Sequence, residues 1–121
     1  MKEIRRESKN KPVIYDFAKE FTEYPGFRYR TISEHSGEEF REEVLEKYYE
    51  DGIPLVINVE GTKVSLGSSF LTEAFAVFAN KIGLDNFKKM VSIDTSTPKG
   101  KIHQEKMMER VEYLHSLLTK N

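Results

Sequence analysis

Residues 69–82 restrict the fold more than any other part of the sequence, because apolar side chains occupy every side of the helix that they would form. Polar residues are few in this stretch, and Gly83 follows it as a stop signal. A helix that is apolar all round has to be buried. We therefore predict a largely buried helix, built on Phe70, Leu71, Ala74, Phe75, Val77, Phe78, Ala79 and Ile82.

A nearly unbroken apolar run precedes this helix. Leu55, Val56, Ile57 and Val59 all lie within the segment IPLVINVEG. Such a run is typical of a central strand that is covered on both faces, as in a parallel sheet. A further short strand is predicted over residues 90–93, which are also mostly apolar.

Two strands are predicted near the N-terminus. Val13, Tyr15 and Phe17 occupy alternate positions, as the buried face of a strand requires. The segment YPGF contains a Pro-Gly turn. Beyond it, two aromatic residues alternate with two arginines over residues 27–30. We therefore expect the second strand to fold back on the first as an antiparallel hairpin.

A second helix is predicted over residues 36–50. Ser36 and Glu39 form a capping box at its start, and Gly52 favours its end. A third helix is expected over residues 101–119. The polar side of the 36–50 helix is an acidic stripe, which we interpret as a solvated face: Glu38, Glu42, Glu43 and Glu46.

The order of these elements predicts an α/β fold, with a small mixed sheet, an opening antiparallel hairpin and about three helices. The 121 residues fit one compact domain. We place this domain over residues 12–121, after a polar tail over residues 1–11. The all-round apolar pattern also predicts that the 69–82 helix is more buried than the 36–50 helix.

The charge balance and the hydropathy exclude several classes of function. The chain has 20 acidic and 19 basic side chains, which does not favour binding to nucleic acid. Cysteine is absent, so thiol chemistry and zinc–thiolate sites are excluded. The N-terminal residues do not resemble a secretory signal, and no stretch approaches the ~20 apolar residues of a membrane span. We expect a cytoplasmic protein with no membrane association.

Catalytic and cofactor motifs are also missing from the sequence. It contains no phosphate-binding loop, no dinucleotide fingerprint and no H-E-x-x-H pair. His35, His103 and His115 lack metal-ligand spacing, and we interpret them as surface residues. We therefore predict no enzymatic activity and no cofactor.

The segment GSSFLTEAF contains two adjacent serines where the chain passes from the strand into the buried helix. Ser69 is the nearer to the apolar run, so we expect it to cap the helix. Ser68 is then expected to face solvent on an apolar, neutral surface. Loops at the carboxyl ends of strands usually carry the sites of open α/β sheets. The carboxylate of Glu73, in the first turn of the helix, is expected to interact favourably with the helix dipole.

Two motifs together resemble a bacterial family of STAS-like domains of unknown function. The first is Ser36, Gly37, Glu38, Phe40 and Arg41, and the second is Gly67, Ser68, Ser69, Phe70, Leu71, Glu73, Ala74 and Phe75. The likeness covers roughly residues 12–94. It implies the STAS fold of anti-sigma-factor antagonists, in which a histidine-kinase-like ATPase both binds and phosphorylates a serine. Ser68 matches that serine. Gly67, Phe70 and Asn58 depart from the antagonist pattern.

The main functional hypothesis is a non-enzymatic module that docks a protein partner, such as a histidine-kinase-like ATPase, under the control of a phosphoserine. The docking residues would be Gly67, Ser68, Ser69, Phe70 and Glu73. An alternative is a phage or mobile-element protein that inhibits a host factor through the same surface. A third hypothesis, nucleotide or nucleic-acid binding, would use Arg28, Arg30, Lys99 and Lys101.

Overall fold

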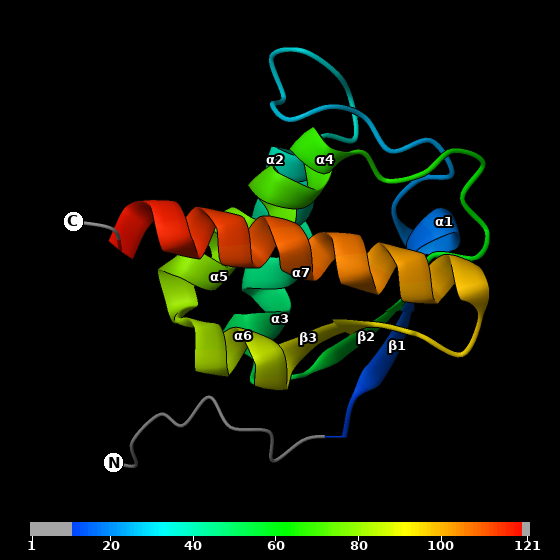
Figure 1. Cartoon of the computed structure of the whole chain (residues 1–121). Coiled ribbons are helices and arrows are strands. Elements are labelled where there is room, and N and C mark those ends of the chain that lie inside the picture. The colour runs from blue at the N-terminus through cyan, green and yellow to red at the C-terminus, as the bar shows by residue number, and fades with distance from the viewer. Residues whose placement is uncertain (1–10, 120–121) are drawn as a thin grey trace.

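Three parallel strands form the sheet of this protein (Figure 1). The structure is a computed structural model, and it describes residues 11–119. Strand β2 (Leu55–Asn58) lies between β1 (Val13–Asp16) and β3 (Val91–Ile93). The polar tail predicted over residues 1–11 lies outside the described residues except for its last position.

The helices pack on one face of this sheet. Along β2 the buried residues Leu55 and Ile57 alternate with the half-buried Val56 and Asn58. Val56 pairs in register with Ile14 of β1, which is largely exposed. The prediction that the central strand is covered on both faces is therefore wrong for the part of the chain that the structure describes.

Two long helices follow β1 and β2. The first consists of α2 (Gly37–Phe40), the π-helical turn η1 (Arg41–Leu45) and α3 (Glu46–Glu50). The second consists of α4 (Ser68–Leu71), the π-helical turn η2 (Thr72–Ala76) and α5 (Val77–Ile82). The C-terminal helix is α7 (Pro98–Thr119). These three match the predicted helices.

Two short helices were not predicted from the sequence. They are α1 (Phe17–Glu20), directly after β1, and α6 (Leu84–Met90), between α5 and β3. Gly83 separates α5 from α6 with a φ angle of 96°, a conformation that favours glycine. No helix within residues 11–119 is long and apolar enough to cross a membrane.

The predicted antiparallel hairpin is wrong, because the chain leaves the sheet after Asp16. The Asp16 carboxylate accepts a hydrogen bond from the backbone N–H of Lys19, which caps α1 and turns the chain away. Residues 21–36 then form a loop that bonds to itself: Gly26 N–H donates to the carbonyl of His35, and Phe27 N–H donates to the Ser33 hydroxyl. The position beside β1 is taken by β2 instead.

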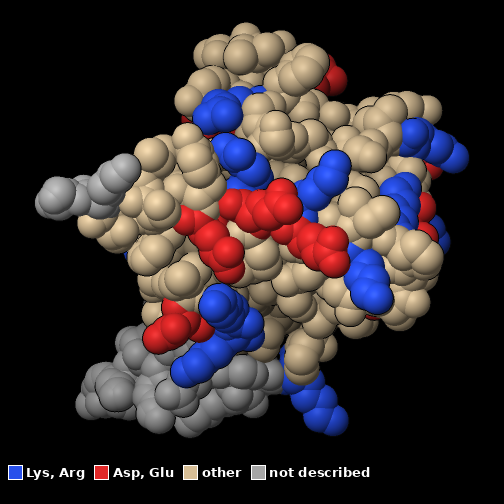
Figure 2. Space-filling model, viewed as in Figure 1, with Lys and Arg blue, Asp and Glu red and all other residues tan. Residues whose placement is uncertain are grey.

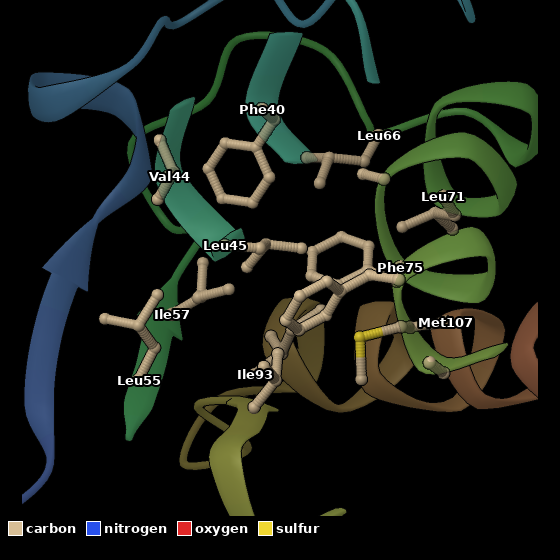
Figure 3. Close-up of a cluster of buried hydrophobic side chains, with 14 of the residues drawn as sticks. Phe40, Val44, Leu45, Leu55, Ile57, Leu66, Leu71, Phe75, Ile93 and Met107 are labelled. Atoms are coloured by element: carbon tan, nitrogen blue, oxygen red, sulfur yellow. The ribbon is translucent and has the colours of Figure 1, made fainter. Parts of the chain in front are cut away.

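The core lies between the sheet, the two long helices and α7 (Figure 3). Phe40 is at the centre of an aromatic cluster, with its ring centroid 5.0 to 6.0 Å from those of four other phenylalanines. The cluster joins α1 and the loop after it to both long helices: Phe17, Phe21, Phe40, Phe70 and Phe75.

The helix that starts at Ser68 is the more buried of the two long helices, as predicted. Every residue from Phe70 to Ala76 is buried. In the first long helix the buried positions are Gly37, Phe40, Val44 and Leu45. The difference arises because the second helix lies against the first helix on one side and α7 on another.

The full burial of Phe75 generates a stability prediction. Phe75→Ala should lower the free energy of unfolding by roughly 3 to 5 kcal/mol, as aromatic truncation in a core does. Phe27→Ala is a matched control, since Phe27 is 62 % exposed, and it should change stability by less than about 0.5 kcal/mol. Urea titration of both variants measures the difference. Equal midpoints would contradict this account of the core.

Candidate functional site

The candidate site is the first turn of α4, where the loop from β2 enters the second long helix. Gly67 and Ser68 are exposed and Ser69 is half-buried, whereas Phe70 is fully buried in the core. Only the first three of these four predicted site residues therefore offer a surface to a partner.

Neither serine caps this helix, so the prediction that Ser69 is the cap is wrong. Gly67 occupies the capping position, and it has an extended backbone and no side chain that could accept a hydrogen bond. The helical backbone starts at Ser68, because the carbonyl of Gly67 already accepts from the N–H of Leu71 at 2.9 Å. Both serine hydroxyls are consequently free of a structural role at the helix start.

His103 of α7 holds the loop that leads to this turn. Its side chain is 4 % exposed, so its interpretation as a surface residue is wrong. Nε2 accepts from the backbone N–H of Leu66 at 3.2 Å, and Nδ1 donates to the carbonyl of Lys99 at 2.9 Å. Lys99 also donates from Nζ to the carbonyl of Thr62. These bonds fix the approach of the loop to Gly67.

Glu73 is buried in an ion pair and does not face a partner. Its Oε2 lies 2.9 Å from a terminal guanidinium nitrogen of Arg41, and the Arg41 Nε donates to the Glu73 carbonyl at 3.1 Å. Glu46 lies 3.5 Å from the other terminal nitrogen of Arg41. The carboxylate of Glu73 is thus occupied by a structural bond between the two long helices.

Gly37 allows these two helices to cross at very short range. A Cβ added at Gly37 would lie 2.7 Å from the carbonyl oxygen of Phe70 and 3.2 Å from the backbone nitrogen of Ala74. Ser36, just before it, is fully buried and its hydroxyl accepts from the N–H of Glu39 at 3.1 Å. The two sequence motifs therefore pack against each other.

Two hollows flank the first turn of α4. The apolar hollow has a volume of about 430 Å³ and is lined by Phe27, Arg28, Tyr29, Ile32 and Ser69. The charged hollow has a volume of about 300 Å³ and is lined by Ser65, Leu66, Gly67, Ser68, Leu71, Lys106, Glu109 and Arg110. Figure 1 shows α4 between the loop 21–36, which lies above it, and α7.

The loop 21–36 is held firmly beside this site. The N–H of Gly37 donates to the carbonyl of Phe27, and the Arg30 side chain donates to the carboxylates of Glu42 and Glu43. The hydrogen bond to Glu42 is the largest cause that raises the pKa of Arg30 above its ordinary value. The acidic stripe predicted as a solvated face therefore also holds the loop.

Basic side chains approach Ser68 from α7, so the expectation of a neutral surface is wrong on this side. Lys106 and Arg110 line the charged hollow together with one carboxylate, that of Glu109. The Arg110 Nε donates to the Thr72 hydroxyl at 2.8 Å, and its guanidinium lies over the Tyr113 ring. Figure 2 shows a row of acidic side chains over α7 and basic side chains above it, toward α4.

Two of the four cations proposed for nucleic-acid binding, Arg30 and Lys99, are occupied by other groups of the protein. Arg30 pairs with Glu42 and Glu43, and Lys99 binds loop carbonyls. Among residues 11–119, no group of three His, Asp or Glu side chains could hold a metal ion.

A comparison with protein families found a match. The model of a family described as a STAS-like domain of unknown function matches residues 36–101, which is more than half of the chain. This range contains both sequence motifs and the two crossing helices. No curated protein and no solved structure matches the sequence significantly.

The serines generate a prediction about capping. Ser68→Ala and Ser69→Ala should each change the free energy of unfolding by less than about 0.5 kcal/mol, because neither hydroxyl caps a helix. Ser36→Ala is the matched control and should cost about 1 kcal/mol, because it removes a real cap. Urea titrations of the three variants make the comparison. A loss of stability in Ser69→Ala as large as that in Ser36→Ala would refute the assignment of Gly67 as the cap.

The helix crossing generates a second prediction. Gly37→Ala should destabilise the protein by about 1 to 3 kcal/mol, as overpacking does, because the backbone of the neighbouring helix cannot move aside cheaply. Gly67→Ala meets nothing within 4 Å, and it should cost only about 0.5 kcal/mol at the capping position. Thermal melts of both variants test this, and similar melting temperatures would contradict the close crossing.

Proposed function

This chain belongs to the family of STAS-like domains of unknown function, and from this membership we propose that it is a non-enzymatic regulatory module that binds a protein partner through the first turn of α4. One observation carries the proposal. Within the part of the chain described, Gly67, Ser68 and Ser69 neither pack in the core nor bond to another element through a side chain; Glu38, the other motif residue outside the core, accepts a hydrogen bond from the Arg30 N–H.

The rest of the two motifs is accounted for by structure. Ser36 caps, Gly37 allows the crossing, Arg41 pairs with Glu73, and the phenylalanines fill the core. Exposed polar residues on a loop that a rigid scaffold positions are typical of binding sites. This contrast supports a binding role for the serine pair.

The proposal that the module is not an enzyme is supported by the bonds that occupy two titratable groups, Glu73 and His103. A serine nucleophile needs a base within hydrogen-bond reach. The Glu73 carboxylate is bound by Arg41, and both ring nitrogens of His103 are bound to backbone groups. Neither group is therefore free to take a proton from Ser68.

The proposed partner is a histidine-kinase-like ATPase that phosphorylates Ser68 in the cytoplasm. The fold resemblance to anti-sigma-factor antagonists suggests this class of partner, and the surroundings of Ser68 suggest how the switch would work. A phosphate on Ser68 would carry about two negative charges into a hollow that Lys106 and Arg110 line. It would cancel the positive charge that these side chains present to the partner.

The switch generates a binding prediction. Ser68→Asp should fold normally, because a negative charge near a helix N-terminus is favourable. It should weaken binding of the partner ATPase by about tenfold or more, whereas Ser68→Ala should bind as the parent chain does. Ser96→Asp is the matched control: it adds the same charge at an exposed position in the loop before α7.

The partner is first recovered with the full chain from cells of the source organism and identified by mass spectrometry with phosphoserine mapping. Binding of each variant is then titrated calorimetrically. If a bound protein is not a kinase and Ser68 carries no phosphate, the inhibitor hypothesis replaces the switch. If Ser68→Asp and Ser96→Asp bind equally well, the first turn of α4 is not the docking site.

A further inference from the structure

The loop 21–36 exposes large apolar side chains beside the serine pair. Phe27 and Ile32 are 62 % and 61 % exposed, and Tyr29 is 42 % exposed. All three line the apolar hollow together with Ser69. Exposed apolar side chains that gather in one place mark interaction sites, whereas single ones need no explanation.

This apolar hollow is preformed. The backbone of the loop bonds to the start of α2, through the carbonyls of Phe27 and Arg28, and the Arg30 side chain fixes its other side to Glu42 and Glu43. A surface that is already ordered loses little conformational entropy when a partner binds. The hollow is therefore suited to receive an apolar side chain.

The charged groups around both hollows are mostly cationic. Among the residues that the structure describes, Arg28 is the only charged one that lines the apolar hollow, and Lys106 and Arg110 outnumber Glu109 in the charged hollow. Within residues 11–119, neither Arg28 nor Lys106 forms an ion pair with a carboxylate. The chain as a whole has a net charge of −1, so this positive excess is local. Complementary charge on a partner is therefore negative.

We infer that the partner docks with an extended acidic segment that crosses the first turn of α4. One large apolar side chain of the segment enters the apolar hollow. The carboxylates of the segment face Lys106 and Arg110 in the charged hollow. Ser69 lines the apolar hollow and Ser68 lines the charged hollow, on two different sides of one helix whose diameter is roughly 10 Å. An extended chain rises about 3.3 Å per residue, so the apolar residue and the acidic residues are separated by about three positions.

This inference rests on the proposed function, because it names the chemistry of the partner at the same site. It also means that the acidic segment and a phosphate on Ser68 compete for the same basic side chains. A phosphate on Ser68 and a carboxylate of the segment would occupy the same hollow beside Lys106 and Arg110. The two anions exclude each other, which connects phosphorylation to release of the partner.

The test is a selection of random twelve-residue peptides displayed on phage against the full chain. The selected peptides should combine a large apolar residue with Asp or Glu about three positions away. Synthetic versions of the enriched peptides are then titrated by fluorescence anisotropy. Their affinity should fall as salt is added, because the charge pairs are exposed to solvent.

Matched variants assign the binding site. Ile32→Asp and Lys106→Glu should each weaken binding of the selected peptides by about tenfold or more. Their controls are Ile102→Asp and Lys101→Glu, which change an exposed isoleucine and an exposed lysine elsewhere on the chain and should bind as the parent does. Circular dichroism melts establish that all four variants fold.

Three results would overturn the inference. The first is that the selected peptides lack acidic residues. The second is that the selected peptides bind Ile32→Asp and Lys106→Glu as tightly as they bind the parent chain. The third is that the chain forms a dimer that Ile32→Asp dissociates, because a second copy would then cover the apolar hollow. If Ser68→Asp weakens binding of the ATPase while Ile32→Asp and Lys106→Glu do not, this inference fails and the proposed function stands. If none of the three variants weakens binding of the ATPase, the inference and the proposed function both fail.

Discussion

The crossing of the two long helices at Gly37 is the contact on which the rest of this structure depends. A glycine at this point lets the backbones of α2 and the second long helix approach closely, since a Cβ would lie 2.7 Å from the Phe70 carbonyl oxygen. The same crossing brings Phe40 into the aromatic cluster and Arg41 against Glu73. An apolar contact, a close backbone contact and a buried ion pair therefore all join the two long helices at this crossing.

This crossing determines where the candidate site lies. It fixes the start of α4 beside the loop 21–36, because that loop is bonded to the start of α2. Helix α7 closes the other side, with His103 bound to the loop before Gly67. Each of the two π-helical turns contains one member of the Arg41–Glu73 pair, and such turns occur frequently at functional sites.

Local patterns in the sequence predicted local features well and long-range pairing poorly. The cap at Ser36 and the buried helix after Ser69 were both confirmed, because each follows from residues within a few turns of one another. The capping box itself is altered, since the Glu39 carboxylate accepts from the N–H of His35 and not from that of Ser36. The prediction of an antiparallel hairpin was wrong because an alternation of aromatic and basic residues over 27–30 is compatible with two structures. Such residues can pair in a sheet, or they can expose their aromatic side chains from a loop. The cap at Asp16 decided between these outcomes.

The sequence by itself determined the three longest helices, which of the first two is the more buried, and that the serine pair lies at the start of that buried helix. The tertiary structure alone decided what surrounds the serines. Lys106 and Arg110 are distant from Ser68 in the chain and reach it only because α7 packs across the second long helix. Periodicity reports the environment of a residue within its own element. The charge and apolar surface that meet at a site depend on how separate elements pack, which no local pattern encodes.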